Sequence, residues 1–439
     1  MDFYKFNEII KGTIIKYENN FNYKISVDTR TLKKNDIFIP ISFKDGCGNK
    51  YILDAVKRGA SLILIPTNYL NETNILEDIL NLNNNVSIIE IDDGLQVLIR
   101  LATYIRNNYK GLVIGITGSN GKTSTKEIMY QVLSEKYKVF KSIDNFNNIL
   151  GMTLMMLEVK DEDILIFEMG MNHLKEISQM SKILKPDIGV ITNIGTAHIG
   201  NLGSKENILK AKLEIMDGFK INSKLFINDN IDVNGKNIIR CDLIPYKIDE
   251  NSIDIVLDDI NIKLKLKGVH NVYNINLVYN VCKYLGLSTE KIISGLKKYK
   301  SYRMNEYIIN DSLVIDDSYN SNYESVINGI KYINITSYKN KILVLGDIKE
   351  LGVFSTNINI DIAKYINNTN ISKVYTYGVL SKDIYDNLEV EKYHYDDIDI
   401  LINDIEKELN NDTIIYIKGS HSMHMDKIVK VLIDKNGHK

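Results

Sequence analysis

Short apolar runs that end in polar turns recur along the chain and predict alternating strands and helices. In the first hundred residues, the runs at 36–40 and 61–66 are typical of strands, and a helix is expected between them at 51–58. An amphipathic stretch at 95–108 predicts a longer helix. This alternation is typical of an α/β fold with a largely parallel sheet.

The middle of the chain continues the pattern and places reactive side chains after its strands. Buried strands are expected at three apolar runs, 112–116, 163–167 and 188–192. Lys122, Glu168 and His198 each follow one of these runs. Alone, such a carboxylate is often a cap and such a histidine is usually structural. Because ligands bind at the carboxyl ends of parallel strands, we expect the three side chains to meet at one edge.

A third set of strands begins after Arg303. It comprises apolar runs at 313–315, 342–345, 373–377 and 414–417, most of which end in a polar, glycine-bearing loop. At 439 residues the chain is also too long for one ordinary core. We therefore predict an α/β protein with a small N-terminal domain at 1–95, a central domain with a mainly parallel sheet at 96–303, and a Rossmann-like C-terminal domain at 304–439.

Composition and charge narrow the possible partners. The chain is 44% hydrophobic and 25% charged, as soluble globular proteins are, and a net charge of -2 gives no reason to expect nucleic acid or an anionic membrane as a partner. Cys47, Cys241 and Cys282 form neither a metal-ligand spacing nor a disulfide framework, which favours a reducing compartment. No run approaches the ~18 apolar residues of a membrane span, and the N-terminus lacks the apolar segment of a signal peptide. We expect a cytoplasmic protein without stable membrane insertion, and a monomer is the working expectation.

The stretch from Gly111 to Tyr130, GLVIGITGSNGKTSTKEIMY, predicts a nucleotide-binding loop. A strand breaks into glycines and a helix opens, so that backbone N–H groups, the helix N-terminus and a lysine can hold phosphates, while a hydroxyl can ligate magnesium. The predicted cradle consists of Gly118, Ser119, Asn120, Gly121, Lys122, Thr123 and Ser124. Its spacing is the compact G-x-x-G-K-T, because Ile116 stands where the usual motif has glycine. An ordinary turn is the alternative, but the flanking strand and helix favour ATP binding.

Other polar segments admit two interpretations. Residues 27–30 offer a hydroxyl and a guanidinium that suit a phosphate or a sugar, or they form an ordinary surface turn. The asparagines at 145–148 either cap the next helix or direct amides at a ligand. His270 and Asn271 either cap a helix or read a base edge. Lys212 lies on a charged helix whose composition predicts a solvated face.

Several segments together resemble the Mur ligase family. In chain order they are ITGSNGKTSTKE, NFNN-IL-G, FEMGMNH, ITNIGTAH, AKLEI, HNVYN, DDSYNSN, LGDIKELG and KGSHSM. With a weaker DTR segment at 28–30, the resemblance covers nearly the whole chain. EMG-x-N, D-SYN-x-N and LGD-x-x-ELG are similar to the branch that joins D-alanyl-D-alanine to UDP-N-acetylmuramoyl-tripeptide.

The resemblance implies an ATP-dependent ligase of peptidoglycan precursor synthesis. Its N-terminal domain would hold the UDP-sugar, its central domain ATP, and its C-terminal domain the dipeptide. The peptide carboxylate would take the γ-phosphate, and the dipeptide amine would then displace phosphate. A sibling ligase that adds the third residue, or a folylpolyglutamate-type ligase, is the alternative. From another class, a phosphate-loop switch or a non-catalytic nucleotide-binding module would bind ATP with no need for Lys212.

The resemblance also implies roles for individual residues. The loop with Lys122 would bind the β- and γ-phosphates of ATP. Magnesium would be served by Thr123, Glu168, His198 and Lys212, the last as a carbamylated lysine. Asn274, Asp317 and Arg303 would contact adenine, ribose and phosphates, respectively. Substrates would be bound by Asp28, Thr29 and Arg30 at the UDP, by Asn148 near the ATP, and by Asp347, Glu350, Lys418 and Ser420 at the dipeptide.

Four positions depart from the family pattern. His421 and His424 stand where arginine is usual, and a neutral histidine would hold a carboxylate less firmly than a permanently charged fork. Asn49 stands where histidine is common, and Tyr323 where proline is common. These departures weaken the assignment of the dipeptide and UDP contacts but leave the ATP segments intact.

Overall fold

The computed structural model describes residues 2–18, 24–43, 46–143, 146–301 and 303–437, and its contacts divide the chain into two compact units. The first unit comprises residues 1–110 and 149–160, and the second comprises residues 111–148 and 161–439. The domain boundaries expected at residues 95 and 303 stay a prediction. Over the described ranges, no helix combines the length and apolar character that a bilayer crossing requires.

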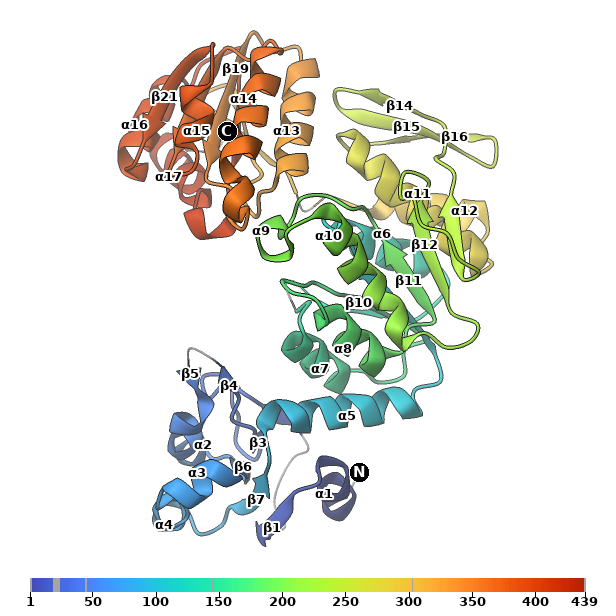
Figure 1. Ribbon diagram of the computed structural model, residues 1–439, viewed down its shortest axis with the longest axis vertical. Helices are drawn as coiled ribbons and strands as arrows, with labels where there is room; N and C mark the ends of the chain where they lie inside the picture. The colour runs from blue at the N-terminus through green and yellow to red at the C-terminus, as the bar shows by residue number, and fades with distance from the viewer. Residues whose placement is uncertain (1, 19–23, 44–45, 144–145, 302, 438–439) are drawn as a thin grey trace. The chain divides into compact units, whose positions relative to one another are not determined.

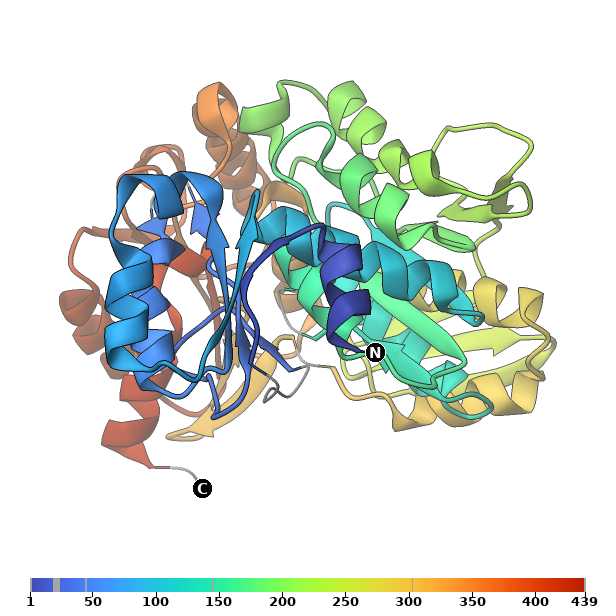
Figure 2. The same ribbon diagram turned by 90° about the horizontal axis from the view of Figure 1, so that it is seen from below.

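The first unit is an α/β sandwich around a five-stranded sheet of order β1-β7-β6-β3-β2, in which β1 is antiparallel (Figures 1 and 2). Its strands are β1 (Thr13–Lys16), β2 (Ile25–Ser26), β3 (Ile37–Phe38), β6 (Leu62–Pro66) and β7 (Ser87–Ile91), with a hairpin of β4 (Ser42–Phe43) and β5 (Gly46–Cys47). Its helices are α1 (Phe3–Ile10), η1 (Gly48–Tyr51), α2 (Ile52–Lys57), α3 (Thr67–Glu72), α4 (Ile75–Leu82), α5 (Gly94–Asn108) and α7 (Ile149–Leu157). The strands and helices predicted in this region are confirmed as β3, β6, α2 and α5.

Apolar side chains of the strands alternate between the two faces of this sheet, and helices cover both faces. Leu62 and Leu64 point to one face, where they pack with α1 and α5, while Ile63 and Ile65 pack on the other face with α2 and α4. Helix α7 joins the first of these cores through its leucines, although the chain on either side of it belongs to the second unit. Of the asparagines expected to cap this helix, Asn145 lies outside the described residues.

The second unit begins with a six-stranded, entirely parallel sheet of order β13-β12-β11-β8-β10-β9. The strands are β8 (Leu112–Thr117), β9 (Val139–Lys141), β10 (Ile164–Glu168), β11 (Ile188–Ile191), β12 (Lys224–Asn228) and β13 (Ile238–Cys241). Its helices are α6 (Lys122–Leu133), α8 (Glu176–Leu184), α9 (Ile199–Leu202), α10 (Lys205–Leu213), η2 (Glu214–Gly218), α11 (Val269–Tyr284) and α12 (Thr289–Lys298). Helices α6, α11 and α12 form the main core of the unit with this sheet. The same core takes in a three-stranded antiparallel sheet of β14 (Tyr246–Asp249), β15 (Ser252–Leu257) and β16 (Ile260–Leu264).

The C-terminal part of this unit is a second six-stranded sheet of order β17-β18-β22-β19-β20-β21, in which β17 pairs antiparallel and the other pairs are parallel. Its strands are β17 (Asn305–Ile309), β18 (Ser312–Asp316), β19 (Asn340–Gly346), β20 (Lys373–Tyr377), β21 (Glu391–Tyr395) and β22 (Thr413–Lys418). Its helices are α13 (Tyr323–Ile335), η3 (Gly352–Phe354), α14 (Ser355–Asn367), α15 (Lys382–Asp386), α16 (Ile398–Lys407), η4 (His421–Met423) and α17 (Asp426–Asn436). Helices α13, α14 and α15 lie on one face and α16 and α17 on the other, as in a Rossmann-like domain (Figure 1).

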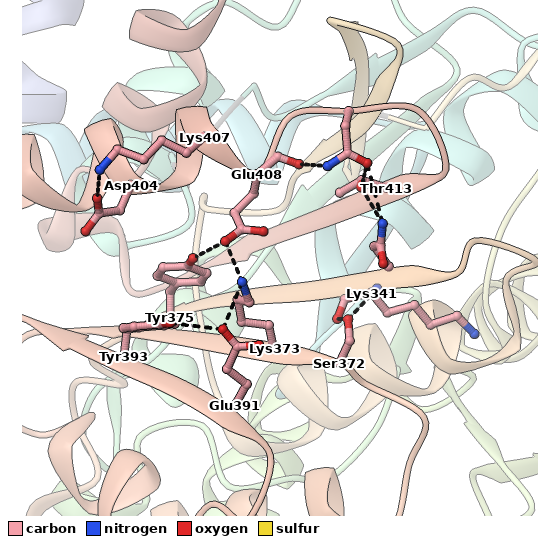
Figure 3. A network of polar contacts seen from close by, with 12 residues as sticks. Lys341, Ser372, Lys373, Tyr375, Glu391, Tyr393, Asp404, Lys407, Glu408 and Thr413 are labelled. Carbon is pink, nitrogen blue, oxygen red and sulfur yellow. Dashed lines mark hydrogen bonds and ion pairs between the residues drawn. The ribbon is translucent and has the colours of Figure 1, made fainter.

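A polar network stabilises the outer strands of this second sheet (Figure 3). The ammonium of Lys373 lies 2.6 Å from Glu408 Oε1 and 3.0 Å from Glu391 Oε1. Tyr375 donates a hydrogen bond of 2.6 Å to the same oxygen of Glu408, and its ring stacks on Tyr393 with centroids 5.2 Å apart. These contacts tie β20, β21 and the end of α16 together; Tyr375 is buried, whereas Glu391 and Tyr393 are exposed.

Candidate active site

The loop between β8 and α6 has a backbone that requires glycine at two positions. Gly118 and Gly121 have φ values of +147° and +77°, which side-chain-bearing residues rarely adopt. A Cβ at Gly118 would lie 1.9 Å from Thr192 Oγ1, and one at Gly121 would lie 2.5 Å from Asn274 Oδ1. The loop is therefore packed against neighbouring polar side chains as closely as its backbone allows. This is the strand–loop–helix geometry that the sequence predicts.

Lys122 opens α6 and lies over the loop that precedes it. Its Nζ donates hydrogen bonds to the carbonyl oxygens of Gly118, at 2.8 Å, and Ser119, at 3.3 Å. Burial lowers the pKa of Lys122, the charge of Arg303 lowers it further, and Glu168 opposes both. The Lys122 ammonium is thus bound to backbone carbonyls of the loop. A bound anion could replace these carbonyls as its partner.

Glu168 ends β10 at the same edge of the sheet and is only 2% exposed. Its Oε2 accepts a hydrogen bond of 2.8 Å from the Thr123 hydroxyl, and its Oε1 accepts one of 3.0 Å from Asn147 Nδ2. The Ser142 hydroxyl fixes the backbone N–H of Glu168 at 3.0 Å. A hydroxyl and a carboxylate therefore meet beside the phosphate loop.

Lys212 corrects the expectation of a solvated face. The side chain is 1% exposed on α10, and it forms no hydrogen bond or ion pair with any described residue. Burial, and then the charge of Lys122, lower the pKa of Lys212 well below its usual value, while Glu168 opposes them. Lys212 therefore belongs to the group around the phosphate loop.

Two hydrogen-bonded pairs join this central region to the start of α13. Asn120 and Asn322 exchange amide hydrogen bonds of 3.1 and 2.6 Å. The carboxylate of Glu324 accepts both the backbone N–H and the hydroxyl of Thr196, each at 2.9 Å. The C-terminal sheet is thereby fixed to the phosphate loop itself and to the loop after β11.

The predicted edge partner His198 contacts the C-terminal region. Its Nδ1 lies 2.7 Å from Glu350 Oε2, and this contact is the main cause that lowers the pKa of Glu350. The next turn adds a hydrogen bond of 3.0 Å from Gly200 N to Glu350 O. Within the described residues, His198 forms no hydrogen bond or ion pair with Lys122 or Glu168.

Asp317 and Lys418 form a buried ion pair at the carboxyl ends of β18 and β22. Lys418 Nζ lies 2.6 Å from Asp317 Oδ2 and also donates to the carbonyl of Asn320, at 2.9 Å. Tyr416 donates to the same carboxylate oxygen, at 2.7 Å. Burial lowers the pKa of His270, and the charges of Asp317 and Lys418 act on it in opposite directions. Lys418 is thus paired with Asp317, and its contact with a dipeptide stays a prediction.

A row of cationic and aromatic side chains leads away from this pair. The Arg303 guanidinium lies 3.6 Å from the centroid of the Tyr319 ring, a cation–π contact. The Tyr319 ring lies 5.9 Å from that of His421, which in turn lies 6.3 Å from that of His424. His421 and His424, which stand where the family pattern has arginine, therefore belong to one series of ring contacts that begins at Arg303.

Asp347 and Ser420 meet at the carboxyl ends of β19 and β22. Asp347 is 1% exposed and accepts hydrogen bonds of 2.8 Å from Ser381 N and from Lys349 Nζ. Its backbone oxygen accepts from Ser420 N, and the Ser420 hydroxyl accepts from Lys349 N at 2.8 Å. The two residues expected at the dipeptide thus belong to one hydrogen-bonded cluster.

The first unit has its own polar edge. A cavity of about 390 Å³ lies at the carboxyl ends of its parallel strands and is lined by Asn49, Thr67 and Asp92, among others. Asp28, Thr29 and Arg30 do not line it. Instead Arg30 binds Asp28 with its guanidinium at 2.6 Å and with its backbone N–H at 2.9 Å, as in a polar turn.

The structure therefore gathers most of the predicted residues of the second unit but adds others. Asn147 contacts Glu168, Asn148 is exposed, and Ser124 lies in the first turn of α6. The same region also contains residues that were not predicted, namely Thr192, Asn193, Asn322, Glu324 and Lys126. Most of these residues lie within the segments that resemble the Mur ligase family, and this was the signal that the sequence offered. Their contacts depend on the fold.

Comparison with known proteins gives a consistent result. The family model described as the Mur ligase middle domain matches residues 116–282, and the one described as the Mur ligase, glutamate ligase domain matches residues 302–421. The UDP-N-acetylmuramoyl-tripeptide--D-alanyl-D-alanine ligase of Bacillus subtilis is 31% identical, with 97% of each chain covered. A MurF crystal structure from Acinetobacter baumannii shares the fold with a TM-score of 0.87 at 24% identity, covering 98% of both chains. MurF from Thermotoga maritima, in complex with ADP, has a TM-score of 0.82 at 24% identity, covering 95% of this chain and 99% of its own.

Proposed function

This chain belongs to the Mur ligase family, and on that premise we propose that it joins D-alanyl-D-alanine to UDP-N-acetylmuramoyl-tripeptide in an ATP-dependent reaction. The relatives that carry this name match almost the whole chain, including the first unit. The observation that carries the ATP-dependent part is the loop at Gly118–Gly121, with Lys122 over its carbonyls and Glu168 on the Thr123 hydroxyl.

The residues at this loop suit magnesium. Mg²⁺ in nucleotide sites is usually held by one or two protein oxygens together with phosphates and water. Thr123 and Glu168 supply such oxygens, 2.8 Å apart, and His198 is proposed as a further contributor. Phosphate oxygens of the bound nucleotide and water would complete the coordination shell. When bound, the ion would neutralise charge on the phosphate oxygens.

Lys212 suits a carbamate. Carbamylation needs a neutral amine, and the buried Lys212 ammonium has no partner among the described residues and a pKa well below the usual one. Conversion of the neutral amine to a carbamate would add a negative charge that the Lys122 ammonium can attract. We propose that this modified side chain serves the magnesium site.

The chain's own contribution to the reaction is charge and positioning. Lys122 and Arg303, whose charges influence one another, would neutralise the transferred phosphoryl group. A carboxylate oxygen of the peptide attacks the γ-phosphorus and ADP leaves. The neutral dipeptide amine then attacks the carbonyl carbon, phosphate leaves, and the nitrogen releases a proton. Asn274 at adenine and Asp317 at ribose would fix the nucleotide, so that both steps occur between held reactants.

The remaining roles rest on the placement of each residue in its unit. We propose that the dipeptide is held by Asp347, Glu350, Lys418 and Ser420. Of these, Lys418 also pairs with Asp317. The UDP-sugar is assigned to the first unit, where Asp28–Arg30 and the cavity beside Asn49 lie, and Asn148 to the substrate side of the ATP site. Cytoplasmic location belongs to the same proposal, consistent with three free cysteines.

A substrate panel tests this function. The purified chain is given ATP and magnesium with each donor and acceptor pair, and products are identified by mass. We expect ligation with UDP-N-acetylmuramoyl-tripeptide plus D-alanyl-D-alanine. Ligation of a single amino acid to the UDP-dipeptide, or of glutamate to a folate, would instead identify a sibling activity and refute the proposal.

A further inference from the structure

Lys126 lies on α6 one turn after Lys122 and is completely buried. Its Nζ has no hydrogen-bond partner among the described residues. Two carboxylate oxygens surround it at longer distances, Glu127 Oε1 at 3.6 Å and Glu168 Oε2 at 4.0 Å. A buried ammonium without hydrogen bonds is costly, so these two charges are what makes its burial tolerable.

The neighbours of Glu168 give this lysine its significance. The hydrogen bonds to the Glu168 carboxylate come from a hydroxyl and an amide, on Thr123 and Asn147, and neither carries charge. Lys126 is the one cation that forms an ion pair with Glu168 in the described part of the chain. It also approaches the same oxygen that Thr123 contacts. The charge of the carboxylate proposed for magnesium is therefore opposed by Lys126 in an ion pair, in addition to the charges of Lys122 and Lys212.

Glu127 provides a second place for the ammonium. Its Oε1 is the nearer acceptor, and its Oε2 forms an ion pair with Lys141 on β9. Lys126 could therefore remain paired with Glu127 when the charge of Glu168 is engaged elsewhere. Lys141, in contrast, contacts Glu127 without contacting Glu168.

We propose that Lys126 is a positioning residue that neutralises Glu168 in the nucleotide-free enzyme and thereby makes cation binding at Glu168 depend on ATP. This inference rests on the proposed function, in which Glu168 and Thr123 take magnesium. Charges about 4 Å apart interact strongly in a buried site, so a free divalent cation meets a site with little net negative charge. The triphosphate supplies the missing negative charge when it binds at the adjacent loop.

The test measures cation binding without catalysis. Mn²⁺ is titrated into the full chain, and free Mn²⁺ is followed by electron paramagnetic resonance, with and without a non-hydrolysable ATP analogue. We expect Lys126→Met to bind Mn²⁺ without nucleotide about tenfold more tightly than the natural chain, because a charge next to the ligand oxygen is removed. With the analogue present the difference should shrink. Lys126→Gln is a second variant should the methionine variant fold poorly.

Three further variants make the result specific. Lys141→Met removes the neighbouring cation on Glu127 and should behave as the natural chain, while Lys126→Met combined with Glu168→Gln should lose the gained affinity. Equal Mn²⁺ binding by Lys126→Met and the natural chain, or an equal gain in Lys141→Met, would overturn the inference while leaving the proposed function standing. If Glu168→Gln alone fails to weaken Mn²⁺ binding in the presence of the analogue, the proposed metal role of Glu168 fails, and this inference fails with it.

Discussion

Replacing Gly121 by alanine tests whether the loop geometry is tied to nucleotide binding. The φ of +77° costs an alanine about 1–2 kcal/mol relative to glycine. The new Cβ would also lie 2.5 Å from Asn274 Oδ1, and Asn274, 2% exposed on α11, would have to turn away. Its Nδ2 has no hydrogen-bond partner among the described residues, so it is available to a ligand. Losing that one contact would weaken ATP binding by about 1.4 kcal/mol, or about tenfold.

Gly286 offers a matched control. Its φ of +73° is nearly the same, but a Cβ there meets nothing within 4 Å, and the residue lies beyond the end of α11. Gly286→Ala should lose about 1–2 kcal/mol of unfolding free energy, as Gly121→Ala does, yet bind ATP normally. Denaturant unfolding and calorimetric titration with an ATP analogue measure the two effects. Natural affinity in Gly121→Ala, or an equal loss in Gly286→Ala, would refute the reasoning.

Three other substitutions test separate parts of the second unit. Lys212→Ala should abolish ligation and regain part of it with added short carboxylic acids that mimic a carbamate; an active variant that ignores them would remove Lys212 from the site. Glu324→Ala, which loses both hydrogen bonds from Thr196, should lower the unfolding free energy by about 2 kcal/mol in denaturant titration, and an unchanged midpoint would contradict this. Glu408→Ala should cost about 1–3 kcal/mol through the network of Figure 3, whereas Lys382→Ala, in an exposed ion pair, should cost under about 0.5 kcal/mol; equal losses would show that burial does not set the difference.

The fold was predictable where burial leaves a simple pattern. Strands β8 and β10 are covered on both faces, so they appear in the sequence as continuous apolar runs. The antiparallel strands β14 to β16 were not predicted, although β15 and β16 alternate apolar and polar residues as half-buried strands do. Helix α7 was sequence-adjacent to the central sheet but packs with the first unit, which only tertiary contacts decide.

The site was predictable where chemistry is local. Gly121 and Lys122 form a strand–loop–helix unit whose function depends on neighbours in sequence. Lys212 resembled a surface lysine because a helical charge pattern does not report which face is covered. Lys126 was not distinguished from a surface lysine for the same reason, although it lies within the ITGSNGKTSTKE segment. Their burial beside Glu168 results from strands and helices far apart in the chain.

Phosphate release from ATP tests the central claim most directly. UDP-N-acetylmuramoyl-tripeptide and D-alanyl-D-alanine are added separately and together, with Lys122→Ala as the inactive control of intact fold. Our proposal predicts release only with both substrates, a UDP-pentapeptide product in equal amount, and neither in the variant. Release that ignores both substrates, or that persists in Lys122→Ala, would contradict the assignment of this chain as a peptide ligase acting through its phosphate loop.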